Sequence, residues 1–159
     1  MSMTLELRAV NDDMLNGLMD GDPETCEAFL SGDGTDLDKA WDGIHFALTG
    51  KKFGDGSGRM SYEPFGDRYL DAVDEGMGPA TYLAPEEVAV VARHLKGIPA
   101  EAFAALVDAK AMLAAEIYPF QQDETDADVR PYLVPNYAAM RELYLSASSS
   151  GMGIVAVMR

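Results

Sequence analysis

The sequence predicts an α+β protein, in which a small sheet includes strands from both ends of the chain and several helices cover it. Residues 3–10 show the apolar alternation of a short strand, and residues 154–158 form an apolar closing strand. Between these ends, most apolar residues recur at helical spacing. The chain has 159 residues, of which 48% are hydrophobic. We therefore expect a single compact domain, residues 1–159, with a sizeable core.

Two short helices are expected after the first strand. Asn11 can cap a helix that runs through Met19, because its side chain can accept a backbone N–H of the first turn. Asp22 precedes Pro23, and proline is favoured at the first position of a helix. This second helix should run to about Leu30.

Residues 36–50 hold the only tryptophan and the clearest helical pattern of the chain. At about 100° per residue, six apolar side chains fall on one arc, and these are Leu37, Ala40, Trp41, Ile44, Ala47 and Leu48. A second stripe carries Asp38, Asp42, His45 and Thr49. Thr35 or Asp36 can cap the start of this helix, and Gly50 can end it.

Residues 51–79 are dense in glycine and are typical of a mobile loop, with one or two helical turns expected between Phe65 and Val73. The glycines do not form a phosphate-binding loop, because no Gly-Lys-Ser/Thr ending follows them. A short strand is expected at residues 80–83, followed by a helix over residues 85–95.

The last third of the chain is expected to contain two helices before the closing strand. The apolar pattern of residues 103–114 predicts one long amphipathic helix, and residues 121–130 read as an exposed loop. Pro131 and Pro135 should forbid a continuous helix there, so Asn136 is expected to cap the last helix.

The formal net charge of −15 limits the classes of partner. A negative field repels phosphate backbones and anionic lipid head groups, so neither nucleic acid nor a membrane surface is expected as a partner. The acidity serves solubility alone, or it steers the protein onto a partner protein with a basic surface. One cysteine, no signal-like start and no apolar run of membrane-spanning length together predict a cytoplasmic protein.

The polar stripe of the central helix contains the candidate catalytic residues Asp38, Asp42 and His45. On a helix these side chains project together, so Asp42 could orient or charge His45 for acid–base catalysis. The same three could hold a divalent metal. The structural alternative, which we favour, is that His45 packs beside Trp41 and bonds to a backbone carbonyl or an acid. No metal and no cofactor is therefore expected.

Glu116, Tyr118 and Trp41 are the candidate ligand-binding residues. Glu116 and Tyr118 could face the same cleft as His45. Alternatively, Tyr118 packs its ring where a helix ends and bonds through its hydroxyl group. Cys26 is expected to be inert core, and His94 a favourable cation near a helix C-terminus.

The segment from Leu37 to Gly50 resembles the signature of the YfbM-like family, a small bacterial domain of unknown function. Residues 80–83 with the Pro85 helix start, and residues 116–119, agree with the family in the same order. The resemblance implies a compact domain with a mixed sheet and helices, and it brings no established activity. Ala84 stands where the family often has threonine, so the next helix should lack a side-chain cap.

No motif in the sequence defines an activity. The favoured hypothesis is a cytoplasmic domain that binds a partner protein with a basic surface, as an inhibitor or immunity protein does. The alternative is a small hydrolase-type enzyme that uses His45 with Asp42 and Asp38. The sequence does not predict an oligomeric state.

Overall fold

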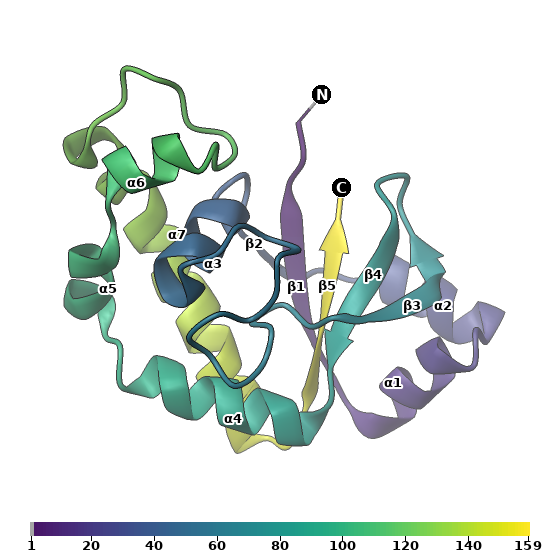
Figure 1. Cartoon of the computed structure of the whole chain (residues 1–159). Helices are drawn as coiled ribbons and strands as arrows, with labels where there is room; N and C mark the ends of the chain where they lie inside the picture. Colours follow the sequence, from purple (N-terminus) through teal and green to yellow (C-terminus); the bar gives the residue numbers. More distant parts are fainter. Residues whose placement is uncertain (1) are drawn as a thin grey trace.

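The computed structural model describes residues 2–159 and has an α+β fold (Figure 1). Its five-stranded sheet has the order β2-β1-β5-β4-β3. The strands are β1 (Leu5–Val10), β2 (Thr35–Asp36), β3 (Arg68–Asp74), β4 (Pro79–Leu83) and β5 (Gly153–Met158). The terminal strands β1 and β5 pair along their whole length, as predicted. Every pairing is antiparallel, so the sheet is not the mixed sheet that the resemblance implied.

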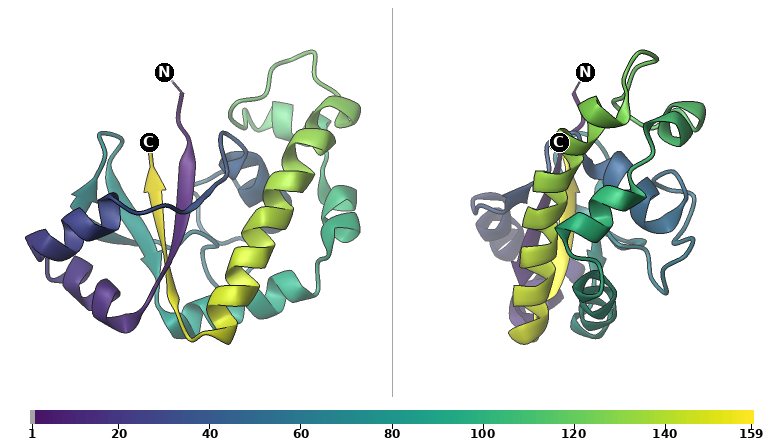
Figure 2. Two further views of the ribbon diagram at one scale, coloured as in Figure 1. Left: turned by 180° about the vertical axis from the view of Figure 1, so that it is seen from behind. Right: turned by 90° about the vertical axis from the view of Figure 1, so that its left-hand side faces the viewer.

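Seven helices pack on the two faces of this sheet within the described part of the chain (Figure 2). They are α1 (Asp12–Met19), α2 (Pro23–Leu30), α3 (Trp41–Thr49), α4 (Pro85–Lys96), α5 (Ala100–Leu106), α6 (Ala109–Ala114) and α7 (Asp126–Ser149). Helices α1 and α2 contact β3 and form a small core on one face. Helices α3 to α7 build the larger core on the other face, where α4 and α7 contact β5.

The predicted caps of the first two helices are present. The side chain of Asn11 accepts a hydrogen bond from the Met14 N–H at 2.8 Å, and Asp22 accepts one from the Thr25 N–H at 2.9 Å. Ala84 gives α4 no side-chain cap, as expected, but Glu87 accepts the Ala84 N–H at 2.9 Å. A carboxylate from the first turn thus takes over part of the capping role.

Helix α3 is shorter than the sequence pattern predicts. Residues 35 and 36 pair with β1 as strand β2, and the helix begins only at Trp41. Asp38 has a φ of 49°, a left-handed conformation that lies outside a right-handed helix. Gly50 does end the helix, with a φ of 79°. Asp38 therefore lies outside α3 and does not share a helical face with Asp42, His45 and Thr49, contrary to the prediction.

The helical turns expected between Phe65 and Val73 are instead part of the edge strand β3. Leu70 and Val73 are both buried, and the pairing register with β4 shifts between Leu70 and Asp74. Because of this irregularity, Leu70 and Val73 both point into the core although they are three residues apart, a spacing that is typical of one face of a helix. The long helix expected over residues 103–114 is also divided, into α5 and α6, with Asp108 capping α6.

Helix α7 runs through both prolines, contrary to the prediction. Six of its side chains are buried: Val129, Leu133, Tyr137, Met140, Tyr144 and Ala147. Burial of a large apolar side chain contributes about 1.5–3 kcal/mol, so the members of this set larger than alanine together outweigh a cost of about 3 kcal/mol per proline. Asn136 lies inside the helix and donates to the Tyr132 carbonyl at 2.9 Å instead of capping it. Within residues 2–159, neither α7 nor any other helix is long and apolar enough to cross a membrane.

Candidate functional site

The connection between α3 and β3, residues 50–67, separates two clefts. We call it the α3–β3 loop. One cleft of about 860 Å³, the helical cleft, lies between this loop, α3 and the segment that follows α6. The other, of about 580 Å³, lies between the loop and the strands and is called the sheet cleft. The side chain of Phe53 lines both clefts, so a single ring divides them.

The α3–β3 loop is held against α3 despite its glycine content. Arg59 donates to the Ala47 carbonyl at 2.9 Å, and the Tyr144 hydroxyl donates to the Pro64 carbonyl. The Lys51 N–H donates to Thr49 Oγ1 at 3.0 Å. These contacts fix the loop at both ends, so the walls that it gives to the two clefts are defined.

Asp42 lines the helical cleft, but its carboxylate is used within the chain. Oδ1 accepts the Phe53 N–H at 2.9 Å, and Oδ2 accepts the Tyr118 N–H at 3.0 Å. The residue is 1% exposed. Since each oxygen binds a backbone donor from a different segment, Asp42 ties the α3–β3 loop and the segment after α6 to α3.

The three candidate ligand-binding residues also line the helical cleft. The side-chain polar groups of Trp41 and Tyr118 are bonded within the chain, whereas the Glu116 carboxylate is exposed and only its backbone carbonyl is bonded. Trp41 donates through Nε1 to the Met3 carbonyl at 2.9 Å and stacks on Tyr118 with ring centroids 5.5 Å apart. The Tyr118 hydroxyl accepts the Met3 N–H at 3.1 Å. The Glu116 carbonyl accepts from Lys52 Nζ at 3.0 Å. The helical cleft is thus built from bonds between chain segments.

His45 lies apart from Asp42, behind the sheet cleft. Its Nδ1 is 2.8 Å from the Lys51 carbonyl oxygen, and its Nε2 bonds to the Glu63 carboxylate. Because a carbonyl oxygen only accepts, Nδ1 donates to it, and Nε2 faces the Glu63 carboxylate. The ring is fully buried, so the imidazole has no surface that a substrate could reach.

Asp38, the third candidate catalytic residue, is removed from both other members of the stripe. Its carboxylate accepts the Tyr132 hydroxyl at 2.7 Å, and that hydroxyl also accepts the Lys39 N–H at 3.0 Å. Burial, together with the hydrogen bond to Asp38, raises the pKa of Tyr132 above its ordinary value of 10.0. Asp38, Asp42 and His45 therefore each serve a separate local bond and do not share a cleft.

For the same reason, Asp38, Asp42 and His45 are not arranged to bind one metal ion. Across residues 2–159 no three side chains among His, Cys, Asp and Glu are arranged to hold a metal ion. Cys26 is buried on α2 in the smaller core, and His94 lies in the last turn of α4.

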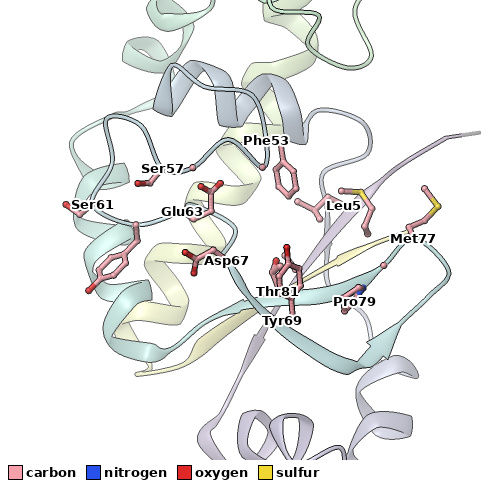
Figure 3. A pocket seen from close by; sticks show the side chains of 17 residues that line it. Leu5, Phe53, Ser57, Ser61, Glu63, Asp67, Tyr69, Met77, Pro79 and Thr81 are labelled. Atoms are coloured by element: carbon pink, nitrogen blue, oxygen red, sulfur yellow. The ribbon is translucent and has the colours of Figure 1, made fainter.

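The sheet cleft contains polar residues that the sequence reasoning did not single out. Glu63 and Asp67 come from the loop, and Tyr69 comes from β3 on the face opposite α1 and α2 (Figure 3). Tyr62 also lines the cleft. Tyr62 is 41% exposed and Tyr69 is 64% exposed. The only signal in the sequence was that tyrosines stand within or beside a segment rich in glycine and serine, a composition also found in binding loops.

Comparison with known proteins agrees with the resemblance in the sequence. A family model described as a domain of unknown function (DUF1877) matches residues 1–157. The crystal structure of a protein of unknown function, YfbM from Escherichia coli, has a similar fold, with a TM-score of 0.71 over 100% of both chains. The two sequences are 20% identical, so this likeness concerns the fold. No curated protein matches the chain. Because the family model covers nearly the whole sequence, the chain belongs to the DUF1877 family, and the YfbM-like resemblance is confirmed.

Proposed function

We propose that this protein acts by binding a partner protein with a basic surface, and that the sheet cleft is the centre of the contact. The observation that carries the proposal is the combination of exposed aromatic rings and acidic groups in this cleft. Tyr62 and Tyr69 are two of four large hydrophobic side chains that are exposed within residues 2–159. Tyrosine is enriched at protein interfaces because its ring contributes apolar area and its hydroxyl bonds to polar groups.

The fold supports this choice of surface. Helices α1 and α2 cover β3 on one face, where Leu70 and Val73 are buried. On the opposite face Tyr69 is mostly exposed, and the cleft lies between it and the α3–β3 loop. The strand β3 also forms one edge of the sheet. Part of the sheet is therefore open to a partner, with a shaped hollow beside it.

The charges support a basic partner. The charged residues that line the sheet cleft are Glu63 and Asp67, and within residues 2–159 no lysine, arginine or histidine lines it. The whole chain carries a formal charge of −15, which attracts a cationic protein from a distance. A cytoplasmic inhibitor or immunity-like role is one form that such binding takes.

A hydrolase that uses His45 with Asp42 and Asp38 receives less support. His45 is buried and bonded at both nitrogens, and each aspartate is bonded elsewhere. Asp42 and His45 are buried, and the exposed Asp38 carboxylate is bonded to Tyr132. We therefore base the proposal on the sheet cleft and not on the α3 motif.

The test is capture of a partner by the immobilised protein, followed by titration of the purified partner. We expect its affinity to fall at least about tenfold for the double variant Tyr62→Ser/Tyr69→Ser, because exposed aromatic residues often dominate interface energies. The matched control is Met19→Ser/Leu106→Ser, which removes the other two exposed apolar side chains. The control should change affinity less than twofold, and added salt should weaken binding. Absence of a basic partner, or an equal loss in the control, would contradict the proposal.

A further inference from the structure

We propose that the sheet cleft receives an arginine side chain of the partner, with the guanidinium group between the tyrosine rings and the carboxylates of Glu63 and Asp67. This inference rests on the proposed function, because it names the group that the partner presents. It is drawn from the free acceptors, the exposed rings and the charge of the cleft.

The cleft offers acceptors that the protein itself does not use. The side chain of Glu63 is 10% exposed, and its Oε1 is bonded to His45. Within residues 2–159 no hydrogen bond reaches Glu63 Oε2, and none reaches the exposed carboxylate of Asp67. Figure 3 shows Glu63 on the loop side of the cleft and Asp67 where the loop leads into β3. A guanidinium group carries five donors in a fixed plane and can use several such acceptors at once.

The rings offer a stacking surface for the same group. Tyr62 and Tyr69 line the cleft and remain exposed. The protein holds one of its own arginines in this manner on the same hairpin. The Arg68 guanidinium lies 4.5 Å from the centroid of the Tyr82 ring and bonds to the Glu87 carboxylate. An aromatic face with a carboxylate at its edge is thus a combination that this sheet already uses to hold arginine.

The charge and the walls of the cleft favour arginine over lysine. Glu63 is paired with His45, whereas within residues 2–159 no basic side chain pairs with the Asp67 carboxylate, so Asp67 remains available to a cation. Apolar side chains such as Leu5, Phe53 and Met158 form much of the remaining wall. Guanidinium is more weakly hydrated than ammonium, so its transfer into an apolar cleft costs less.

The experiment is a titration of the ¹⁵N-labelled protein with three blocked tripeptides, acetyl-Gly-Xaa-Gly-amide, in which Xaa is arginine, lysine or citrulline. Citrulline keeps the shape of arginine and removes its charge. We expect the arginine peptide to shift the backbone amide signals of residues 61–69 saturably below about 10 mM, a range that detects millimolar affinity. Lysine should bind more weakly, and citrulline should cause no saturable shift.

Two isosteric variants locate the effect. Asp67→Asn should weaken arginine binding about fivefold, as expected for loss of one partly exposed charge pair. Asp71→Asn changes the same charge on an exposed β3 residue outside the cleft and should change binding less than twofold. Equal responses to arginine and citrulline, no saturable shift, or equal losses in the two variants would overturn the arginine assignment. Failure of the peptide titration would leave the result of partner capture unaffected. Peptide binding without capture of any partner would overturn only the proposed function.

Discussion

The helical cleft and the sheet cleft share Phe53 but differ in how their polar groups are used. In the helical cleft, Asp42, Trp41 and Lys52 bind backbone groups of other segments. In the sheet cleft, the Asp67 carboxylate and the Tyr69 ring are exposed to solvent. The comparison teaches that the most distinctive segment of the sequence, on α3, serves as scaffold, whereas the exposed polar groups of the sheet cleft lie on a less distinctive loop and strand.

The largest expected effect follows from removing the carboxylate that anchors the helical cleft. Asp42→Ala would leave the buried N–H groups of Phe53 and Tyr118 without an acceptor. We expect a loss of about 3–5 kcal/mol in the free energy of unfolding, because each charged hydrogen bond contributes about 1.5–3 kcal/mol. Urea-induced unfolding measures this value. A loss below about 1 kcal/mol would show that Asp42 is not a structural anchor.

The pair behind the sheet cleft should show a smaller but coupled effect. His45→Phe keeps an aromatic ring, leaves the Glu63 carboxylate without its partner and removes one of the two donors to the Lys51 carbonyl. We expect a loss of about 2–4 kcal/mol in unfolding free energy. The variants Glu63→Leu and His45→Phe, measured alone and together, complete a double-mutant cycle. Strictly additive losses would mean that the two side chains do not stabilise each other.

Trp41 provides a milder test of the helical cleft. Trp41→Phe retains an aromatic ring and removes the Nε1 donor to the Met3 carbonyl. The expected loss is about 1–2 kcal/mol, since one buried acceptor loses its donor and the side chain becomes smaller. Thermal unfolding at constant pH measures it. An unchanged stability together with a changed affinity for a partner would instead assign Trp41 to binding.

Asp38 can be tested through the pH dependence of its partner Tyr132. Burial and the bond to Asp38 raise the pKa of Tyr132 above that of an unfolded tyrosine, so folding favours the neutral phenol. The stability that this provides is complete below about pH 10 and is lost as the pH rises through and above that value. The free energy of unfolding, measured at a series of pH values from neutral to alkaline, should therefore decrease less steeply for Tyr132→Phe than for the wild type. Parallel curves would contradict the assignment.

The smallest effect is expected in the sheet cleft. Tyr69 is 64% exposed, so Tyr69→Ser should change the unfolding free energy by less than about 0.5 kcal/mol. The measurement is urea-induced unfolding of the variant and the wild type under the same conditions. A loss above about 1 kcal/mol would place this ring in the core and weaken the contrast between the clefts.

The sequence predicted those features that depend on local chemistry. The caps at Asn11 and Asp22 and the end of α3 at Gly50 follow from short-range patterns and are present. Each terminal strand follows from its own local pattern, and the two strands pair with each other as expected. The prediction was wrong where packing outweighed propensity, as in α7, which continues through Pro131 and Pro135. It was also wrong where an irregular strand imitates a helix, as between Leu70 and Asp74.

The candidate site was harder to predict because its parts come from distant segments. The partners of Asp42 lie 11 and 76 positions away, and Glu63 lies 18 positions from His45. Periodicity on one helix cannot indicate such partners. The helical pattern also included Asp38, which lies before the start of α3 and has a left-handed backbone conformation. The favoured expectation is that His45 packs beside Trp41 and bonds to a backbone carbonyl or an acid. Its nitrogens contact one group of each kind, and its ring lies against Phe53 and Phe65.

One pair of isosteric substitutions tests the central contrast most directly. Asp42→Asn and Asp67→Asn make the same chemical change in the two clefts, and urea-induced unfolding compares them under one set of conditions. We expect Asp42→Asn to lower the free energy of unfolding by about 2 kcal/mol or more, because only one acceptor oxygen remains for two buried N–H groups. Asp67→Asn should change it by less than about 0.5 kcal/mol. Equal losses, or a larger loss at Asp67, would contradict the assignment of α3 as scaffold and the sheet cleft as the available surface.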